Sequence, residues 1–274
     1  MDRRTFLLNG AAALAVRGVA APVATRSEAG QLKLGVATYS LRKFPRAEAI
    51  RMLKVLGVRY VSIKSFHLPY ELSPEEIRAG AQEFRDAGFT ILSGGNIPLN
   101  NPAELRKMFE YAKAAGMPMM VCAPTHQTLD EVEKLVKEFD IKAAIHNHGP
   151  EDKHFPTPES VLRAIENRDR RMGLCIDVGH TTRMGVDVVE WIRRAGPRLF
   201  DVHIKDLADL MDGRSQVPVG RGAMPIVAIF KTLKAMNYQG GVMLEYEIDA
   251  DNPLPGMIES IAYMRGVLDG LAGA

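Results

Sequence analysis

The sequence is poor in cysteine, in long apolar runs and in net charge, and each shortage argues against a class of protein. Only two cysteines, Cys122 and Cys175, occur among the 274 residues. Both fall within predicted strands, where small residues are often buried, and a chain of this length can form a core without disulfide bonds. We therefore expect two free thiols rather than a disulfide-stabilised fold.

Long apolar runs are missing after the N-terminus, where no segment approaches the roughly 20 apolar residues of a membrane-spanning helix. The N-terminus itself is different, because Arg3 and Arg4 precede an apolar, alanine-rich run from Phe6 to Ala21. This pattern resembles a twin-arginine export signal over residues 1–29. It predicts a periplasmic or otherwise exported protein that has no membrane partner after signal removal. The alternative is a disordered tail with an accidental Arg-Arg pair.

The formal net charge is only +2, and removing residues 1–29 lowers it to 0, because four arginines and two acids leave. Affinity for nucleic acid comes mainly from Lys and Arg side chains that neutralise phosphates. We therefore expect no nucleic-acid partner. A homo-oligomer is compatible with this composition.

Short apolar runs alternate with longer amphipathic segments from Leu32 onward, which is typical of repeated β-α units around a parallel sheet. An open doubly wound sheet usually has a Gly-rich phosphate turn after its first strand, but here that turn is Tyr39-Ser40-Leu41-Arg42. The sequence therefore predicts one α/β domain over residues 30–274, a (β/α)8 or TIM barrel. The eight predicted strands begin near Leu32, Tyr60, Thr90, Met119, Lys142, Gly173, Leu199 and Gly241.

The predicted helices have clear boundary signals. Ser73 and Thr157 are each followed by proline and an acidic residue, which is typical of a helix N-terminus. The segment 207–223 is the longest irregular one, and long loops at this end of a barrel tend to be functional. Glycines that can take the left-handed conformation are predicted to end the helices before strands two, three and four: Gly57, Gly88 and Gly116.

Residues that ligate metals gather where strands five to eight end, which is the rim where TIM barrels form their active sites. Side chains two residues apart on a strand share a face, so one residue from each of these strands can point to the barrel axis. The four residues predicted to converge are His146, Asp177, His203 and Glu245. Imidazole and carboxylate together suit one divalent ion, whether Mn, Zn, Co, Fe or Mg, and do not choose among them.

These strand ends resemble the xylose isomerase-like TIM barrel superfamily over residues 32–271, and in particular a secreted subgroup of the sugar phosphate isomerase/epimerase type. The resemblance implies a metal bound by a Glu, Asp, His, Glu quartet, whose last three members match Asp177, His203 and Glu245. At the first position this chain has His146 instead of Glu, and His148 and Glu151 are alternative ligands there. The runs that resemble the family are HNHGPE at 146–151, LCIDVGH, FDVHIKD, VPVGRG and LEYE.

The resemblance implies a metal-dependent enzyme that removes a proton next to the carbonyl of a sugar or keto-sugar, as isomerases and epimerases do. A lyase that cleaves 3-keto-glycosides by β-elimination shares this first step and is an alternative. A noncatalytic sugar-binding barrel is another, because His146 departs from the family. An apurinic-site endonuclease needs more metal ligands and a basic face, so the charge argues against it.

The candidate catalytic bases are Glu247, Lys205 and His148, because each lies two residues from a proposed ligand. An ordinary ion-pair role is the alternative for each. His180 matches a position that the family uses against substrate.

Three further residues are candidates for substrate binding. Lys64 and His67 follow the second predicted strand, where an internal lysine is costly unless it meets an anion or a substrate oxygen. Arg221 lies between two glycines in the long loop and can clamp a hydroxyl, carboxylate or phosphate, unless it is a solvated loop residue. Gly94-Gly95-Asn96 after strand three is expected either to let backbone approach a ligand or to form a plain turn.

Overall fold

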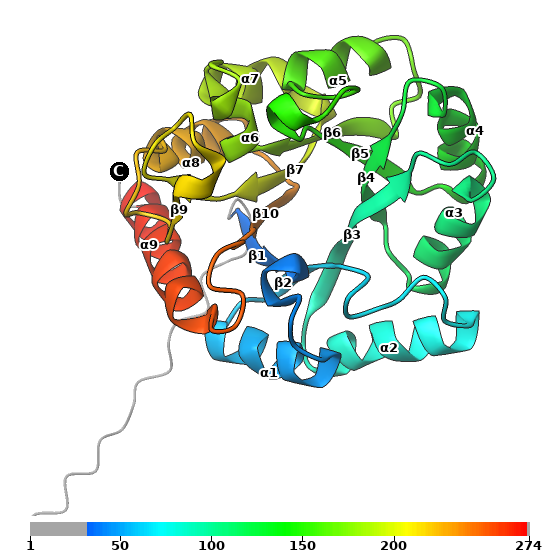
Figure 1. The fold of residues 1–274 in the computed structure, drawn as a ribbon, viewed down its shortest axis with the longest axis horizontal. Coiled ribbons are helices and arrows are strands. Elements are labelled where there is room, and N and C mark those ends of the chain that lie inside the picture. The colour runs from blue at the N-terminus through cyan, green and yellow to red at the C-terminus, as the bar shows by residue number, and fades with distance from the viewer. Residues whose placement is uncertain (1–31, 273–274) are drawn as a thin grey trace, which may run out of the picture. The chain divides into compact units, whose positions relative to one another are not determined.

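The computed structural model describes residues 32–272, which form a closed barrel of eight parallel strands surrounded by helices (Figure 1). Around the barrel the neighbours run β1, β10, β7, β6, β5, β4, β3, β2 and back to β1. The predicted single-domain (β/α)8 fold is confirmed. The barrel strands are β1 (Lys33–Ala37), β2 (Tyr60–Ile63), β3 (Thr90–Leu99), β4 (Met119–Pro124), β5 (Lys142–His146), β6 (Met172–Asp177), β7 (Leu199–Ile204) and β10 (Gly241–Leu244).

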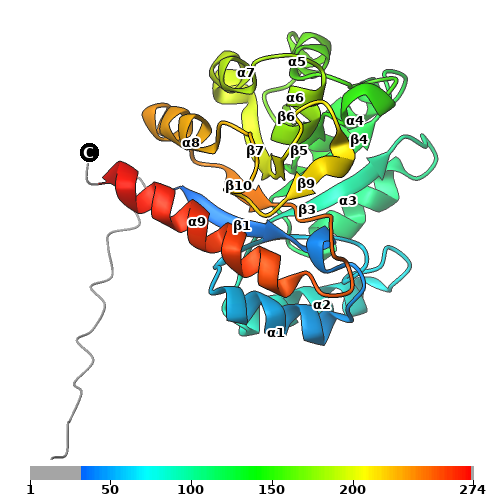
Figure 2. The ribbon, with the colours of Figure 1, turned by 60° about the vertical axis from the view of Figure 1, so that its left-hand side comes forward.

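Helices pack around the outside of the barrel, and the last of them closes the ring. The helices are α1 (Arg46–Leu56), α2 (Pro74–Asp86), α3 (Leu105–Ala114), α4 (Leu129–Phe139), α5 (Pro158–Ile165), α6 (Val178–Arg183), α7 (Val188–Ala195), α8 (Ile226–Ala235) and α9 (Leu254–Ala272). Figure 2 shows α9 along the outside of the barrel, where it contacts both α8 and α1. The last described helix is thereby joined to the first.

The helix boundaries follow the predicted signals. Ser73 and Thr157 each form a capping box, in which the side chain accepts a hydrogen bond from the backbone N–H three residues later and the backbone N–H of Ser73 or Thr157 donates to the side chain of that later residue. The three predicted glycines have φ between 62° and 94°, a conformation that only glycine adopts at low cost. These ends set the length of the loops between helix and strand.

Two strands differ in length from the prediction. The third runs on through Gly94-Gly95-Asn96 to Leu99, with a shift of register against β4 after Gly94. Neither glycine there has a positive φ; a Cβ on Gly95 would lie 2.6 Å from the Ser62 hydroxyl. These glycines therefore allow close packing inside the barrel and do not form a turn. The eighth strand stops at Leu244, so the predicted strand residues Glu245 and Glu247 lie in the loop after it.

The long loop after β7 contains some regular secondary structure. It contains an antiparallel pair of short strands, β8 (Asp206–Leu207) and β9 (Gln216–Val217). The Asp206 carboxylate accepts hydrogen bonds from the backbone of Gly220, Gly222 and Met224. This buried aspartate therefore fixes the loop across the barrel rim.

Both cysteines are buried free thiols, as predicted. Among residues 32–272, every helix is too short or too polar to span a bilayer. The export signal predicted around Arg3 and Arg4 lies outside the described residues.

Candidate metal centre at the barrel mouth

Four side chains from consecutive barrel strands meet at the C-terminal rim. His146 ends β5, Asp177 ends β6, His203 lies near the end of β7, and Glu245 directly follows β10. Because Asp177 and His203 are register partners in parallel strands, their side chains point to the same side, into the barrel. One ligand atom from each of the four lies within 4.8 Å of all the others. We call these four residues the quartet.

Several buried atoms of the quartet have no hydrogen-bond partner. Within the described part of the chain, both ring nitrogens of His146, both of His203 and Oδ2 of Asp177 form no hydrogen bond, although three of these five atoms face an ionisable partner. His146 Nε2 lies 3.5 Å from Asp177 Oδ2, and His203 Nδ1 lies 3.2 Å from Glu245 Oε2. Unpaired buried polar atoms are costly, and native proteins rarely keep them. Converging imidazole nitrogens and carboxylate oxygens fit a divalent metal ion, which would satisfy these atoms.

Lys205, one of the predicted catalytic residues, contacts two members of the quartet. Lys205 Nζ lies 3.0 Å from Asp177 Oδ2 and 3.2 Å from Glu245 Oε2, and it also forms a close ion pair with Glu247. Burial alone would lower the pKa of Lys205, but these three carboxylates raise it well above 10.5. These contacts favour the cationic form of Lys205, and its role as a general base stays a prediction.

The two histidines of the quartet have opposite electrostatic surroundings. Burial, together with the neighbouring His148, lowers the pKa of His146 to about 3. Burial acts in the same direction on His203, but the charge of Glu245 outweighs it and raises the pKa of His203 to about 9. His146 on β5 is therefore neutral at pH 7 and can bind a metal through a ring nitrogen. His203 on β7 is paired with the carboxylate of Glu245.

Two further histidines surround His146 on the β5 and β6 side. The centroid of the His148 ring lies 4.3 Å from that of His146, and the His180 centroid lies 5.9 Å from it. His148 Nε2 lies 2.7 Å from the amide nitrogen of Asn96, and its Nδ1 lies 3.3 Å from Asp152. The backbone N–H of His180 donates to the Asp177 carboxylate, which caps α6 and fixes that carboxylate.

Glu247 and Lys64 lie on the other side of the mouth, near the ends of β10 and β2. The Glu247 side chain is 38% exposed, and its backbone is fixed because its N–H donates to Gln216 and its carbonyl accepts from Arg42. Lys64 Nζ donates to the Asn96 carbonyl at 3.1 Å. Burial lowers the pKa of Lys64, against the opposing charge of Glu245. Both residues are placed to meet a molecule that enters the mouth.

Two other residues predicted for the site, His67 and Glu151, lie outside the quartet. Both ring nitrogens of His67 are engaged, with the Thr38 hydroxyl at 3.0 Å and the Leu41 carbonyl at 3.1 Å, so it joins two loops and has no nitrogen free for substrate. Glu151 pairs with Arg183 at the surface and is outside the quartet, which removes it as an alternative ligand.

Arg221 also departs from the prediction. Its guanidinium is 64% exposed and pairs with Glu259. It lines a separate cavity of 480 Å³ at the rim, together with Tyr246 and Asp249, and none of the quartet lines this cavity. Its role in substrate binding would therefore require a ligand long enough to reach from the quartet into this cavity.

Sequence reasoning missed two residues that support the site. Asn147 accepts a hydrogen bond from the Asp177 backbone and donates to Thr181, so it joins the ends of β5 and β6. Cys175 lies beneath the quartet and forms a second group of potential ligands with His146 and His203. Its position two residues before Asp177 on one strand already indicates that both side chains share a face.

Comparison with known protein families identifies the family to which this chain belongs. The model of the xylose isomerase-like TIM barrel family matches residues 50–267, and the chain belongs to this family. An inosose dehydratase of Clostridium perfringens is 28% identical over 156 residues, which are 50% of this chain and 52% of that protein. The chain thus spans about half the length of the curated relatives that it matches.

Solved structures show the same fold. A protein from Parabacteroides distasonis is 26% identical, with a TM-score of 0.68 over 86% of this chain and 98% of that one. The IOLI protein, solved with a bound zinc atom, is 18% identical, with a TM-score of 0.74 over 87% of this chain and 99% of that one. The relatives support a sugar-modifying enzyme at the level of the family.

Proposed function

We propose that this protein is a divalent-metal-dependent enzyme that removes a proton next to the carbonyl of a sugar or keto-sugar. The convergence of four buried ligands with unpaired donor atoms at the barrel mouth supports this proposal. When bound there, a divalent ion would polarise a substrate oxygen. The likeness to inosose dehydratase and to a zinc-containing barrel supports both the reaction class and the metal.

Two residues are placed to move the proton, and they stand on different sides of the mouth. Glu247 follows β10 and His148 follows β5, and the strands between them are β7 and β6, which provide His203 and Asp177. Glu247 is the carboxylate nearest to solvent beside the quartet. Lys205 would stabilise the negative charge that develops on the substrate when the proton leaves, because its ammonium group is held beside Asp177 and Glu245.

The His148 ring is set up as a base. Burial and the neighbouring His180 lower its pKa, so the ring is neutral at pH 7. Asp152 lies beside Nδ1, which makes this the protonated nitrogen and leaves Nε2 with the basic lone pair. In the structure this lone pair accepts from Asn96, and a substrate carbon acid would replace that contact.

A lyase on 3-keto-glycosides is the second candidate, because the neutral imidazole of His148 can act first as a base and then, once protonated, as an acid. In β-elimination, His148 would take the proton from carbon, the released electron pair would form the C=C bond, and the C–O bond to the leaving group would break. The imidazolium would then return a proton to the leaving oxygen. One imidazole is enough for this sequence, whereas epimerisation needs an acid and a base on opposite faces of the carbon, which Glu247 and His148 together would provide.

Solvent deuterium exchange tests the shared first step. We expect metal-loaded protein in D₂O to incorporate deuterium next to the carbonyl of keto-sugars or 3-keto-glycosides, and chelator to abolish this. Glu247→Gln and His148→Gln should each reduce exchange by on the order of 100-fold or more, while Glu190→Gln, in an exposed pair with Arg194 on α7, should not. Release of an alcohol identifies the lyase. A sugar that raises the melting temperature without any exchange would instead support a noncatalytic binding barrel.

We also propose that the protein is exported, as the Arg3-Arg4 signal predicts. Replacing both arginines with lysine should retain the protein in the cytoplasm of a host with a twin-arginine pathway. Fractionation that finds both forms in the same compartment would contradict export by this route.

A further inference from the structure

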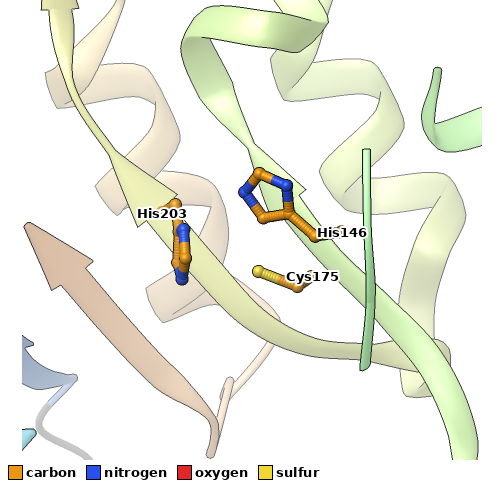
Figure 3. Close-up of side chains that lie close together, drawn as sticks. All are labelled: His146, Cys175 and His203. Carbon is orange, nitrogen blue, oxygen red and sulfur yellow. The ribbon is translucent and has the colours of Figure 1, made fainter. Parts of the chain in front are cut away.

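A cysteine lies directly beneath the quartet, and its sulfur faces two of the proposed metal ligands. Figure 3 shows the Cys175 side chain from β6 between His146 of β5 and His203 of β7. One ligand atom from each of these three residues lies within 4.8 Å of the other two. All three side chains are almost completely buried.

The register of the strands explains this arrangement. His146 and Cys175 are partners in neighbouring parallel strands, while Asp177, two residues further along β6, is the partner of His203. Cys175 and Asp177 therefore point to the same side, one above the other. The two groups of potential ligands share His146 and His203, and they differ in whether sulfur or the carboxylates of Asp177 and Glu245 complete them.

Hydrogen bonding distinguishes Cys175 from the other cysteine. The Cys122 thiol donates to the Ala144 carbonyl at 3.6 Å. Within residues 32–272 no residue forms a hydrogen bond to the Cys175 sulfur. One ring nitrogen of each neighbouring histidine faces a carboxylate, and the other, Nδ1 of His146 and Nε2 of His203, has no partner. One thiol and two imidazoles, which are soft or borderline ligands, therefore lie close together.

We propose that Cys175 is a further metal ligand and that it gives the centre a second binding position, selective for thiophilic divalent ions. In this position a metal–sulfur bond would form, the thiol proton and one ring proton of His203 would pass to solvent, and the neutral rings of His146 and His203 would complete the site. Thiolate ligands favour ions such as Cd²⁺, Zn²⁺ and Co²⁺ over Mn²⁺ and Mg²⁺, which prefer oxygen. The inference deepens the proposed function, because it concerns the same metal centre.

Ion binding tests this proposal without measuring turnover. Full-length protein would be stripped of metal and titrated with Cd²⁺ and with Mn²⁺ against a chelating dye, as wild type, Cys175→Ser and Cys122→Ser. We expect Cys175→Ser to weaken Cd²⁺ binding by on the order of tenfold or more and to leave Mn²⁺ binding within about twofold of wild type. Cys122→Ser should change neither. Equal Cd²⁺ affinity in wild type and Cys175→Ser would overturn the proposal.

Cobalt provides a readout that does not depend on the folding of the variant. A thiolate bound to Co²⁺ gives a near-ultraviolet charge-transfer band, which we expect in wild type and Cys122→Ser and not in Cys175→Ser. Absence of the band from Co²⁺-loaded wild type would overturn the proposal. If Mn²⁺ binds while Cys175→Ser changes nothing, only the sulfur ligand is wrong. If no ion binds to wild type, the metal dependence of the proposed function fails as well.

Discussion

The ammonium nitrogen of Lys205 lies 3.0 Å from Oδ2 of Asp177, in the centre of the group of side chains that is proposed to bind metal. Two further carboxylates, Glu245 and Glu247, contact the same nitrogen. The lysine therefore compensates a cluster of buried negative charge whenever the metal is absent. With metal bound, it becomes a second positive charge beside the substrate.

Removing this cation should destabilise the metal-free protein. Lys205→Met leaves three carboxylates without their cation, and we expect a loss on the order of 3 kcal/mol in the free energy of unfolding. Added Mn²⁺ should restore more stability to the variant than it adds to wild type. The measurement is urea unfolding with chelator and with Mn²⁺, and Lys43→Met, from an exposed pair with Asp251, is the control with little effect. Equal stability of metal-free wild type and Lys205→Met would contradict this role.

Gly179 should be needed to position Lys205. A Cβ at Gly179 would lie 2.8 Å from Cγ and Cδ of Lys205, whose nitrogen is fixed by its carboxylate partners and cannot retreat. We expect Gly179→Ala to cost about 1–3 kcal/mol and to reduce deuterium exchange into substrate. Gly266→Ala in α9 is the matched control, since no described atom lies within 4 Å of the added Cβ and alanine favours a helix. Similar stability and exchange rates in both variants would refute the argument.

His67 should make stability depend on pH. Burial lowers its pKa below 6.5, so the folded protein keeps the ring neutral where the unfolded chain takes up a proton. The contribution of His67 is therefore complete above pH 6.5 and declines as the pH falls through the folded-state pKa. We expect His67→Gln to be less stable than wild type at pH 7.5, with a smaller difference at pH 5. Urea unfolding at both pH values measures this. Gln127→Ala, at an exposed position without a titratable side chain, is the control.

Much of the fold and part of the site could be predicted from the sequence, because both depend on local periodicity. The strand starts follow from alternating apolar and amphipathic segments, and the convergence of His146, Asp177, His203 and Glu245 follows from the period of two along each strand. Cys175 obeys the same rule and could have been found in the same way.

The features that the sequence did not predict are contacts between residues far apart in the chain. The ring of His67 is turned away from the mouth by Thr38 and Leu41, which precede it by 29 and 26 residues. Arg221 is held by Glu259, 38 residues later. The position of Lys205 among the carboxylates likewise depends on how three strands and one loop meet. No local pattern contains this information, because these partners become neighbours only after the barrel has closed.

The metal content of the purified full-length protein tests the central claim most directly. Mass spectrometry of wild type, Asp177→Ala, His203→Ala and the surface control Asp251→Ala should find about one divalent ion per chain in wild type and control. Both quartet variants should lose it while they retain the barrel by circular dichroism. Wild-type protein that binds no ion after incubation with manganese or zinc, or quartet variants that keep their metal, would contradict the account.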